Sequence, residues 1–169
     1  MQIKRDDIIF LDTNVIIEAE RSGILKTLTG YFKNLTTVEK CLQELDEGDK
    51  SDPEYIRVDT KFLAEKLSIR SVSQRELAEL LLKLNNEIAL DTGEKELLAH
   101  INSHSLSLYF ICSPDKACIR ASDKLGLIDK VVSLEDLAES SGLNKAKLLH
   151  HFSKQWLNKF KTDLLLEKI

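Results

Sequence analysis

The sequence predicts a three-layer α/β/α fold with a central parallel sheet, plus a C-terminal helical extension. Two short apolar runs, residues 8–11 and 106–112, have the length and composition of buried strands. The segment between them is long and shows helical spacing of its apolar residues, which is the kind of crossover that parallel strands require. Each of the two runs is followed by an aspartate, Asp12 and Asp115. We therefore expect helices on both faces of a buried sheet.

The positions of individual helices follow from capping residues and apolar spacing. Thr36 with Glu39, and Ser73 with Glu76, have the spacing of capping boxes, in which each residue satisfies a free backbone amide of the other. Gly126 is placed to end a helix in the left-handed conformation. The elements expected from these patterns are helices near residues 14–21, 36–48, 73–84, 91–101 and 117–125, and a third strand at 130–133.

Composition places the chain among ordinary globular proteins. Hydrophobic residues make up 43% of the 169 residues, so the chain can bury one sizeable core. No apolar run approaches the roughly 18 residues that cross a bilayer, and we expect a cytoplasmic protein without a membrane partner. The three cysteines, Cys41, Cys112 and Cys118, are odd in number and lack CxxC spacing. They predict buried thiols rather than a disulfide framework or a zinc ribbon.

Asp12 and Asp115 carry the first functional signal. Ligands of open parallel sheets gather at the carboxyl ends of the strands, where both residues are expected. Two carboxylates held close together repel each other unless a cation neutralises them. Because their donors are oxygens, Mg²⁺ or Mn²⁺ is the expected cation.

Four segments, in order, resemble the motifs of PIN-domain nucleases, the family that includes VapC-type toxin ribonucleases. The resemblance covers residues 8 to about 133, with the order and approximate separations of the family. The segments are Leu11-Asp12-Thr13-Asn14-Val15, Gln43-Glu44-Leu45, Leu90-Asp91-Thr92-Gly93-Glu94 and Ser113-Pro114-Asp115. In the third segment Glu94 stands where an aspartate is more frequent.

The resemblance implies a PIN-like nuclease domain over residues 1–135 that hydrolyses RNA as a metal-dependent endoribonuclease. It implies Mg²⁺ or Mn²⁺ as cofactor, and RNA as substrate. A role as the toxin of a toxin–antitoxin pair, a protein antitoxin and a homodimer are left open. The implied catalytic residues are Asp12, Glu44, Glu94 and Asp115, of which Asp12, Glu94 and Asp115 hold the metal. Thr13, Asn14, Asp91 and Ser113 are expected to supply hydrogen bonds that fix the carboxylate rotamers.

Each acid also has an ordinary structural interpretation. Asp12 and Asp115 could serve as helix caps, and Asp91 with Glu94 has the spacing of a capping box. Glu44 could belong to a solvated helix end. Pro114 occupies the middle of the fourth motif, where an acid is often found, which argues against a fifth ligand there. The alternative function is a catalytically silent PIN-like scaffold or binding module.

His100 and His104 are spaced to share one helix face, a geometry that can bind metal. Neither an HExxH motif nor a third ligand is evident nearby in the sequence. The pair is therefore interpreted as ordinary helix residues.

Within the C-terminal extension, residues 136–169, charge sets residues 145–169, the basic tail, apart from the rest of the chain. Residues 1–144 hold 18 lysines and arginines against 26 acids, or −8, whereas residues 145–169 hold six lysines against two acids, or +4. Apolar residues at spacings of three or four predict a long helix there, starting near Asn144. They are Leu149, Phe152, Trp156, Phe160 and Leu164. Lysines on its other faces, above all Lys154, Lys159 and Lys161, are expected to contact nucleic acid, although simple packing explains the apolar residues equally well.

Overall fold

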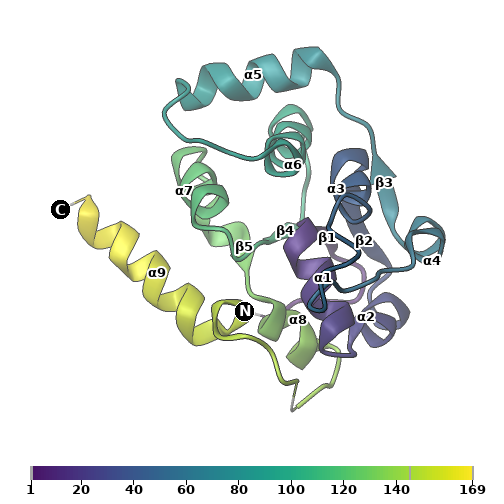
Figure 1. Ribbon diagram of the computed structural model, residues 1–169. Helices are drawn as coiled ribbons and strands as arrows, with labels where there is room; N and C mark the ends of the chain where they lie inside the picture. Colours follow the sequence, from purple (N-terminus) through teal and green to yellow (C-terminus); the bar gives the residue numbers. More distant parts are fainter. Residues whose placement is uncertain (1, 145, 169) are drawn as a thin grey trace.

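A five-stranded parallel sheet forms the centre of the protein, in a computed structural model that describes residues 2–144 and 146–168 (Figure 1). The strand order is β3-β2-β1-β4-β5. The strands are β1 (Ile8–Leu11), β2 (Asn34–Val38), β3 (Ser68–Arg70), β4 (Tyr109–Cys112) and β5 (Val131–Val132). Strand order reverses between β1 and β4, which pair in register from Ile8 with Tyr109 to Leu11 with Cys112. In sheets of this kind such a reversal opens a crevice at the carboxyl ends of the two strands.

Alternating side chains of the strands feed two separate hydrophobic cores. Ile9 and Leu11 of β1 enter one core, and Phe10 between them enters the other. In β4, Ile111 packs on the Phe10 side, and Cys112 on the opposite side. This two-sided burial explains the uninterrupted apolar character of the strands and confirms the three-layer α/β/α architecture.

The helices divide between the two faces of the sheet (Figure 1). The Leu11 face is covered by α1 (Thr13–Arg21), α2 (Leu25–Tyr31), α4 (Thr60–Lys66) and α8 (Leu134–Ser140). The Phe10 face is covered by α5 (Gln74–Leu84), α6 (Thr92–Ser103), α7 (Lys116–Lys124) and α9 (Lys154–Glu167). The short helix α3 (Glu39–Glu44) follows β2 directly and contributes Cys41 to the second core. Cys41, Cys112 and Cys118 are buried free thiols, as expected.

Several predicted helix boundaries are confirmed. The Ser73–Glu76 capping box opens α5, with both reciprocal hydrogen bonds present. Gly126, two residues beyond α7, has φ +76° and so adopts the left-handed conformation that glycine tolerates best.

The predicted capping box at Thr36 and Glu39 is wrong. Residues 34–38 form β2, and the Thr36 hydroxyl donates to the carbonyl of Asn34 instead of capping a helix. Thr36, Thr37 and Val38 are all β-branched, which favours a strand. The helix begins at Glu39, and β2 and β3 extend the sheet beyond the three strands that were expected.

The expected long helix from Asn144 is also shorter than predicted. A 3₁₀ turn (His150–Phe152) precedes α9, and Ser153 caps α9 by accepting a hydrogen bond from the Trp156 amide. Lys145, one of the six lysines of residues 145–169, lies outside the described residues. Buried Glu18 of α1 accepts a hydrogen bond from the Leu149 amide, so a tertiary contact uses a backbone group that a helix would need.

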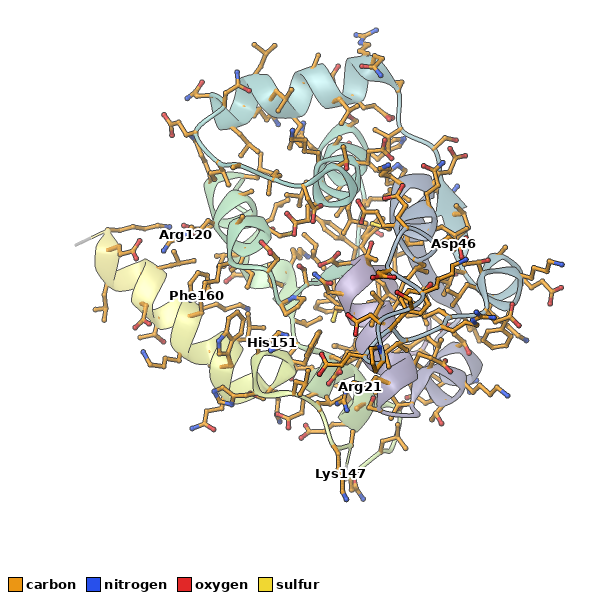
Figure 2. All side chains as sticks on the ribbon, in the orientation of Figure 1. Arg21, Asp46, Arg120, Lys147, His151 and Phe160 are labelled. Carbon is orange, nitrogen blue, oxygen red and sulfur yellow. The ribbon has the colours of Figure 1, made fainter. Side chains whose placement is uncertain are left out.

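The C-terminal helix α9 packs onto the domain through Leu157, Phe160 and Leu164, which join the Phe10 core. The Arg120 guanidinium of α7 lies 5.4 Å from the centre of the Phe160 ring, and Figure 2 shows the two side chains together. Arg120 also pairs with Glu167 near the end of α9. Among the helices of residues 2–144 and 146–168, none combines the length and the apolar character needed to cross a bilayer.

Candidate active site

Asp12 occupies the point where β1 ends and α1 begins, at the switch between β1 and β4. Its side chain is only 2% exposed, and it accepts a hydrogen bond of 2.9 Å from the Ser113 hydroxyl, which follows β4. Asp12 is at the N-cap position of α1 but accepts no capping hydrogen bond of good geometry. The Asn14 amide interacts with the carboxylate and opposes the rise of its pKa that burial causes, but less than the Ser113 hydroxyl does, so capping is only a minor part of its environment.

Asp115 and Asp91 cap helices, in addition to any other role. Asp115 Oδ1 accepts hydrogen bonds from the amides of Ala117 (2.8 Å) and Cys118 (3.2 Å) at the start of α7. Asp91 Oδ1 accepts from the Glu94 amide at 2.8 Å. Each of these bonds uses Oδ1, and Oδ2 of each aspartate makes no hydrogen bond among the described residues.

Glu94 completes the capping box of α6 with one oxygen and leaves the other without a partner. Its Oε2 accepts from the Asp91 amide at 3.3 Å. The residue is 2% exposed, and among the described residues its buried Oε1 has no hydrogen-bond partner. A buried oxygen without a partner costs about 1–3 kcal/mol, and an ion or a water molecule at this place would remove that cost.

The charges of Asp12, Asp91 and Asp115 affect the pKa of Glu94, which shows that these acids lie near one another. Burial raises the pKa of Glu94 from 4.5 to about 8, with further contributions from the charges of Asp115, Asp91 and Asp12. Burial also raises the pKa of Asp12 from 3.8 to about 6; the Ser113 hydrogen bond opposes this rise, and the charges of Asp91 and Asp115 add to it. The protein therefore holds negative charge here at a cost, which a cation would remove.

The donor set fits a hard divalent cation. Carboxylate oxygens from Asp12, Glu94 and Asp115 are of the type that Mg²⁺ and Mn²⁺ prefer, and the free Oε1 of Glu94 is ready to ligate. These acids are spaced more widely than a second group, Glu76, His100 and His104, whose donor atoms lie within 4.8 Å of one another.

Glu44 lies beside this group and is bound differently from the other acids. Its Oε2 accepts from the Thr13 hydroxyl at 2.8 Å, and its Oε1 accepts from the Gly93 amide at 2.9 Å. Both carboxylate oxygens are thus engaged in holding the start of α1 against the start of α6. Glu44, which the resemblance implied to be catalytic, thus makes contacts that position helices, and Thr13 donates a hydrogen bond to an acid.

Two other residues expected to orient the acids behave differently from each other. Ser113 contacts Asp12 directly and also accepts a hydrogen bond of 3.2 Å from the Asp115 amide. Asn14 is exposed, and its side chain makes no hydrogen bond to any described residue. Asn14 instead lines a cavity of about 560 Å³ together with Leu149 and His151 of the C-terminal segment.

Gly93 is a functional position that the sequence-based interpretation did not single out. A Cβ at this residue would lie 2.6 Å from Glu44 Oε2 and 2.9 Å from Oε1, too close for either atom to stay in place. The sequence did contain a hint of this contact, because glycine in the first turn of a helix is less stable than alanine there. The glycine is explained by the close approach of the Glu44 carboxylate to the Gly93 backbone.

We expect Gly93→Ala to lower the free energy of unfolding by about 1–2 kcal/mol, because the new methyl group breaks the hydrogen bonds of Glu44. Urea unfolding measures this change. Gly30→Ala in α2 is the matched control, since its Cβ would meet no atom within 4 Å and helix propensity should make it neutral or stabilising. Equal stability of the two variants would contradict the proposed close contact.

Comparison with known proteins adds one positive finding. A family model described as a PIN domain matches residues 8–128, which includes all four acidic segments and the sheet from β1 to β4. No curated protein matches the chain.

Proposed function

The chain belongs to the PIN-domain family and so has a nuclease-type fold, and we propose that it is a metal-dependent endoribonuclease that hydrolyses RNA phosphodiester bonds. The observation that carries this proposal is the buried, unpartnered Oε1 of Glu94 beside Asp12 and Asp115. Carboxylates whose pKa values are raised by burial and by each other are stabilised in their charged form when a cation binds between them, and such perturbed groups are common at functional sites. Its place at the β1–β4 switch is where open α/β sheets bind ligands.

In this proposal Asp12, Glu94 and Asp115 hold Mg²⁺ or Mn²⁺. When bound, the cation lowers the pKa of a water molecule and stabilises negative charge on the phosphate oxygens. Ser113 keeps the Asp12 carboxylate in one rotamer, and Asp91 holds Glu94 at the start of α6. Glu44 acts as a positioning residue through Thr13 and Gly93.

The proposal is tested by incubating the protein with end-labelled single-stranded RNA and Mn²⁺, Mg²⁺ or EDTA. Cleavage should require the divalent ion. Because water attacks the phosphate in this mechanism, products should lack a 2′,3′-cyclic phosphate, and a single 2′-deoxy substitution at the cut should leave cleavage intact. Cyclic ends or cleavage in EDTA would contradict the mechanism, and binding of RNA without cleavage would favour the scaffold alternative.

The VapC-type resemblance extends the proposal to a toxin whose partner is a protein antitoxin. In this proposal the antitoxin inhibits cleavage by covering the acidic crevice. A bound antitoxin should then prevent Mn²⁺ from binding at Glu94 and Asp12. The nuclease proposal itself does not depend on this partner or on a homodimer.

The basic tail is proposed to attract RNA, because an acidic body repels a polyanion. Its lysines make local contacts: Lys154 pairs with Glu139 (2.6 Å), and Lys159 pairs with Asp163 (3.0 Å). Exposed pairs of this kind are weak and can exchange for phosphate. Lys161 is half-buried, donates to the Val131 carbonyl at 2.6 Å, and has a pKa lowered by burial. We therefore expect Lys161 to stabilise the fold more than it contacts RNA.

Neutralising Lys154 and Lys159 together to glutamine should weaken RNA binding and reduce the slope of log K against log salt by about 1.4, or about 0.7 for each phosphate that is no longer neutralised. Fluorescence anisotropy at several salt concentrations measures the slope. The control is the double variant Lys26→Gln, Lys50→Gln, which removes two exposed lysines outside the tail. If the slope is unchanged in the variant Lys154→Gln, Lys159→Gln, and also when Lys161→Gln is added to it, the tail only packs against the domain.

A further inference from the structure

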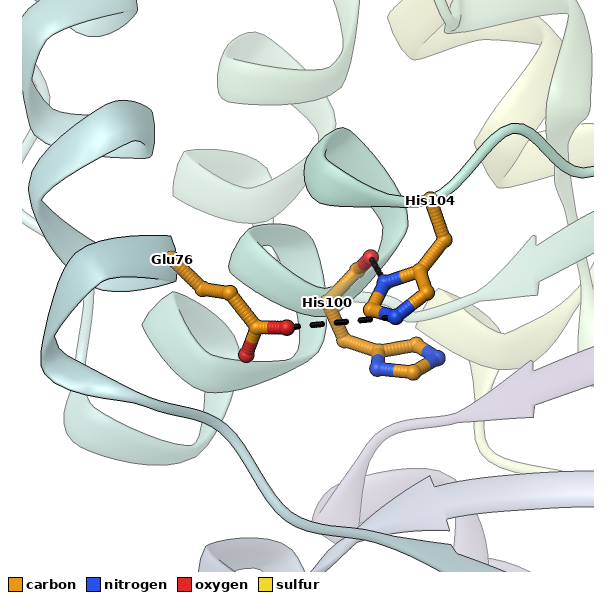
Figure 3. Close-up of side chains that lie close together, drawn as sticks. All are labelled: Glu76, His100 and His104. Carbon is orange, nitrogen blue, oxygen red and sulfur yellow. Dashed lines mark hydrogen bonds and ion pairs between the residues drawn. The ribbon is translucent and has the colours of Figure 1, made fainter.

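His100 and His104, at the C-terminal end of α6, lie beside a third possible metal ligand that their sequence spacing did not reveal. Glu76, in the first turn of α5, lies beside them because α5 packs against α6 (Figure 3). One donor atom from each of the three side chains lies within 4.8 Å of the other two. His104 Nε2 is 3.9 Å from Glu76 Oε1, and the two imidazole rings stack with centres 4.2 Å apart.

Hydrogen bonds already orient two of the three groups. His104 Nδ1 lies 2.8 Å from the His100 carbonyl, which can only accept, so Nδ1 carries the proton and Nε2 presents its lone pair. Glu76 uses Oε2 to accept from the Ser73 amide in the α5 capping box, which leaves Oε1 facing His104. A backbone carbonyl behind a histidine and a fixed carboxylate are the supporting contacts that metal ligands usually have.

His100 provides the independent observation that points to a ligand. The residue is 7% exposed, and among the described residues its buried Nδ1 has no hydrogen-bond partner. Figure 3 shows this ring beneath that of His104, with Glu76 to one side of both rings. Burial, with a smaller contribution from His104, lowers the pKa of His100, so the imidazole is neutral near pH 7 and able to coordinate.

An ion pair between protonated His104 and Glu76 does not account for this arrangement. The 3.9 Å separation is longer than a hydrogen bond, and such a pair would still leave His100 Nδ1 unsatisfied. A bound cation satisfies all three free positions at once.

We propose that Glu76, His100 and His104 form a binding site for a divalent transition-metal ion of the zinc type, separate from the acidic site. Two imidazole nitrogens and one carboxylate oxygen suit Zn²⁺ and Co²⁺ better than Mg²⁺. Tetrahedral ligands at 2.0–2.1 Å lie about 3.3 Å apart, so a modest inward movement of side chains closes the site. His104 is partly exposed, which gives the ion a path from solvent. The bound ion would fasten α5 to α6.

Zn²⁺ binding is tested on the full chain by competition with a chromophoric chelator, and the ligands are tested by Co²⁺ absorption. We expect one Zn²⁺ equivalent that survives Asp12→Asn, and nitrogen-ligand bands with Co²⁺. In the Asp12→Asn protein, in which the acidic site is disabled, a hundredfold excess of Zn²⁺ over the dissociation constant should raise the unfolding midpoint by ~5–10 °C. Adding His104→Gln to this variant should abolish these effects, and adding Glu76→Gln should weaken binding at least tenfold while retaining the Ser73 cap, because a glutamine oxygen also accepts that bond.

Two controls separate this site from general zinc affinity. Glu79→Gln removes a neighbouring carboxylate on α5 that contacts Arg75 and Ser103, and His151→Gln removes an exposed histidine of the tail. Both should bind Zn²⁺ as the unaltered protein does. With Asp12→Asn present in every variant, retention of the Zn²⁺ equivalent in folded His104→Gln and Glu76→Gln, or its loss in His151→Gln, would overturn the proposal.

Discussion

Replacing Asp12 by asparagine is expected to lower metal-dependent RNA cleavage by roughly a thousandfold or more, equivalent to about 4 kcal/mol of activation barrier. Asparagine has nearly the same shape and can still accept the Ser113 hydrogen bond, so the local structure should persist. What it removes is the negative charge that is proposed to bind the cation. Cleavage rates at saturating Mn²⁺ measure the effect.

The same substitution should leave the metal-free protein as stable as before, or more stable. Burial and the neighbouring acids raise the pKa of Asp12 to about 6, so its charge opposes folding at neutral pH. Loss of activity together with retained stability distinguishes a ligand from a structural residue, for which both would fall. Urea unfolding in EDTA provides this second measurement.

Asp46→Asn is the matched control for Asp12→Asn. Asp46 is exposed, follows α3, and makes no side-chain hydrogen bond among the described residues (Figure 2). The same chemical change should therefore leave cleavage within about twofold. Cleavage unaltered in Asp12→Asn, or equally reduced in both variants, would mean that the activity lies elsewhere.

The parts of the fold that the sequence predicted correctly are those specified by local chemistry. β1 and β4 are continuous apolar runs, and the capping boxes at Ser73 and Asp91 satisfy their own backbone amides. β2 was missed because Asn34, Thr36 and Thr37 interrupt its apolar character, and β3 because it has only three residues; both strands exist by pairing with neighbours. The Thr36–Glu39 pattern satisfied the rule for a helix start, but strand pairing with β1 prevailed.

The candidate site shows the same division between local and tertiary information. Asp12 and Asp115 could be brought together from sequence because strand ends define one edge of a parallel sheet. The contact of Glu44 with the Gly93 amide joins residues 49 positions apart, and nothing in either segment encodes it. Glu76 likewise reaches His104 only through the packing of α5 on α6. A contact between residues so far apart in the sequence can be recognised only in the folded chain.

The metal-free protein is expected to lose stability as pH rises from about 5 to 8, and Glu94 should account for most of this loss. The pKa of Glu94 is about 8 in the folded protein against an ordinary 4.5. Between these values the folded state keeps a proton that the unfolded chain has released, so the folded state binds more protons and rising pH favours unfolding. At about 1.4 kcal/mol per pH unit, the contribution is roughly 3 kcal/mol across this window.

The measurement is the difference in unfolding free energy between the unaltered protein and Glu94→Gln at several pH values in EDTA. Taking the difference cancels His100, whose lowered pKa acts in the opposite direction in both proteins. The difference should grow in favour of Glu94→Gln from pH 5 to 8. Saturating Mn²⁺ should reverse it, because the unaltered protein offers the ion one more ionised carboxylate and so binds it more tightly than Glu94→Gln does. Glu65→Gln, at an exposed position of α4, should show no such trend. A difference independent of pH would mean that Glu94 ionises normally and that its buried oxygen is not held ready for a cation.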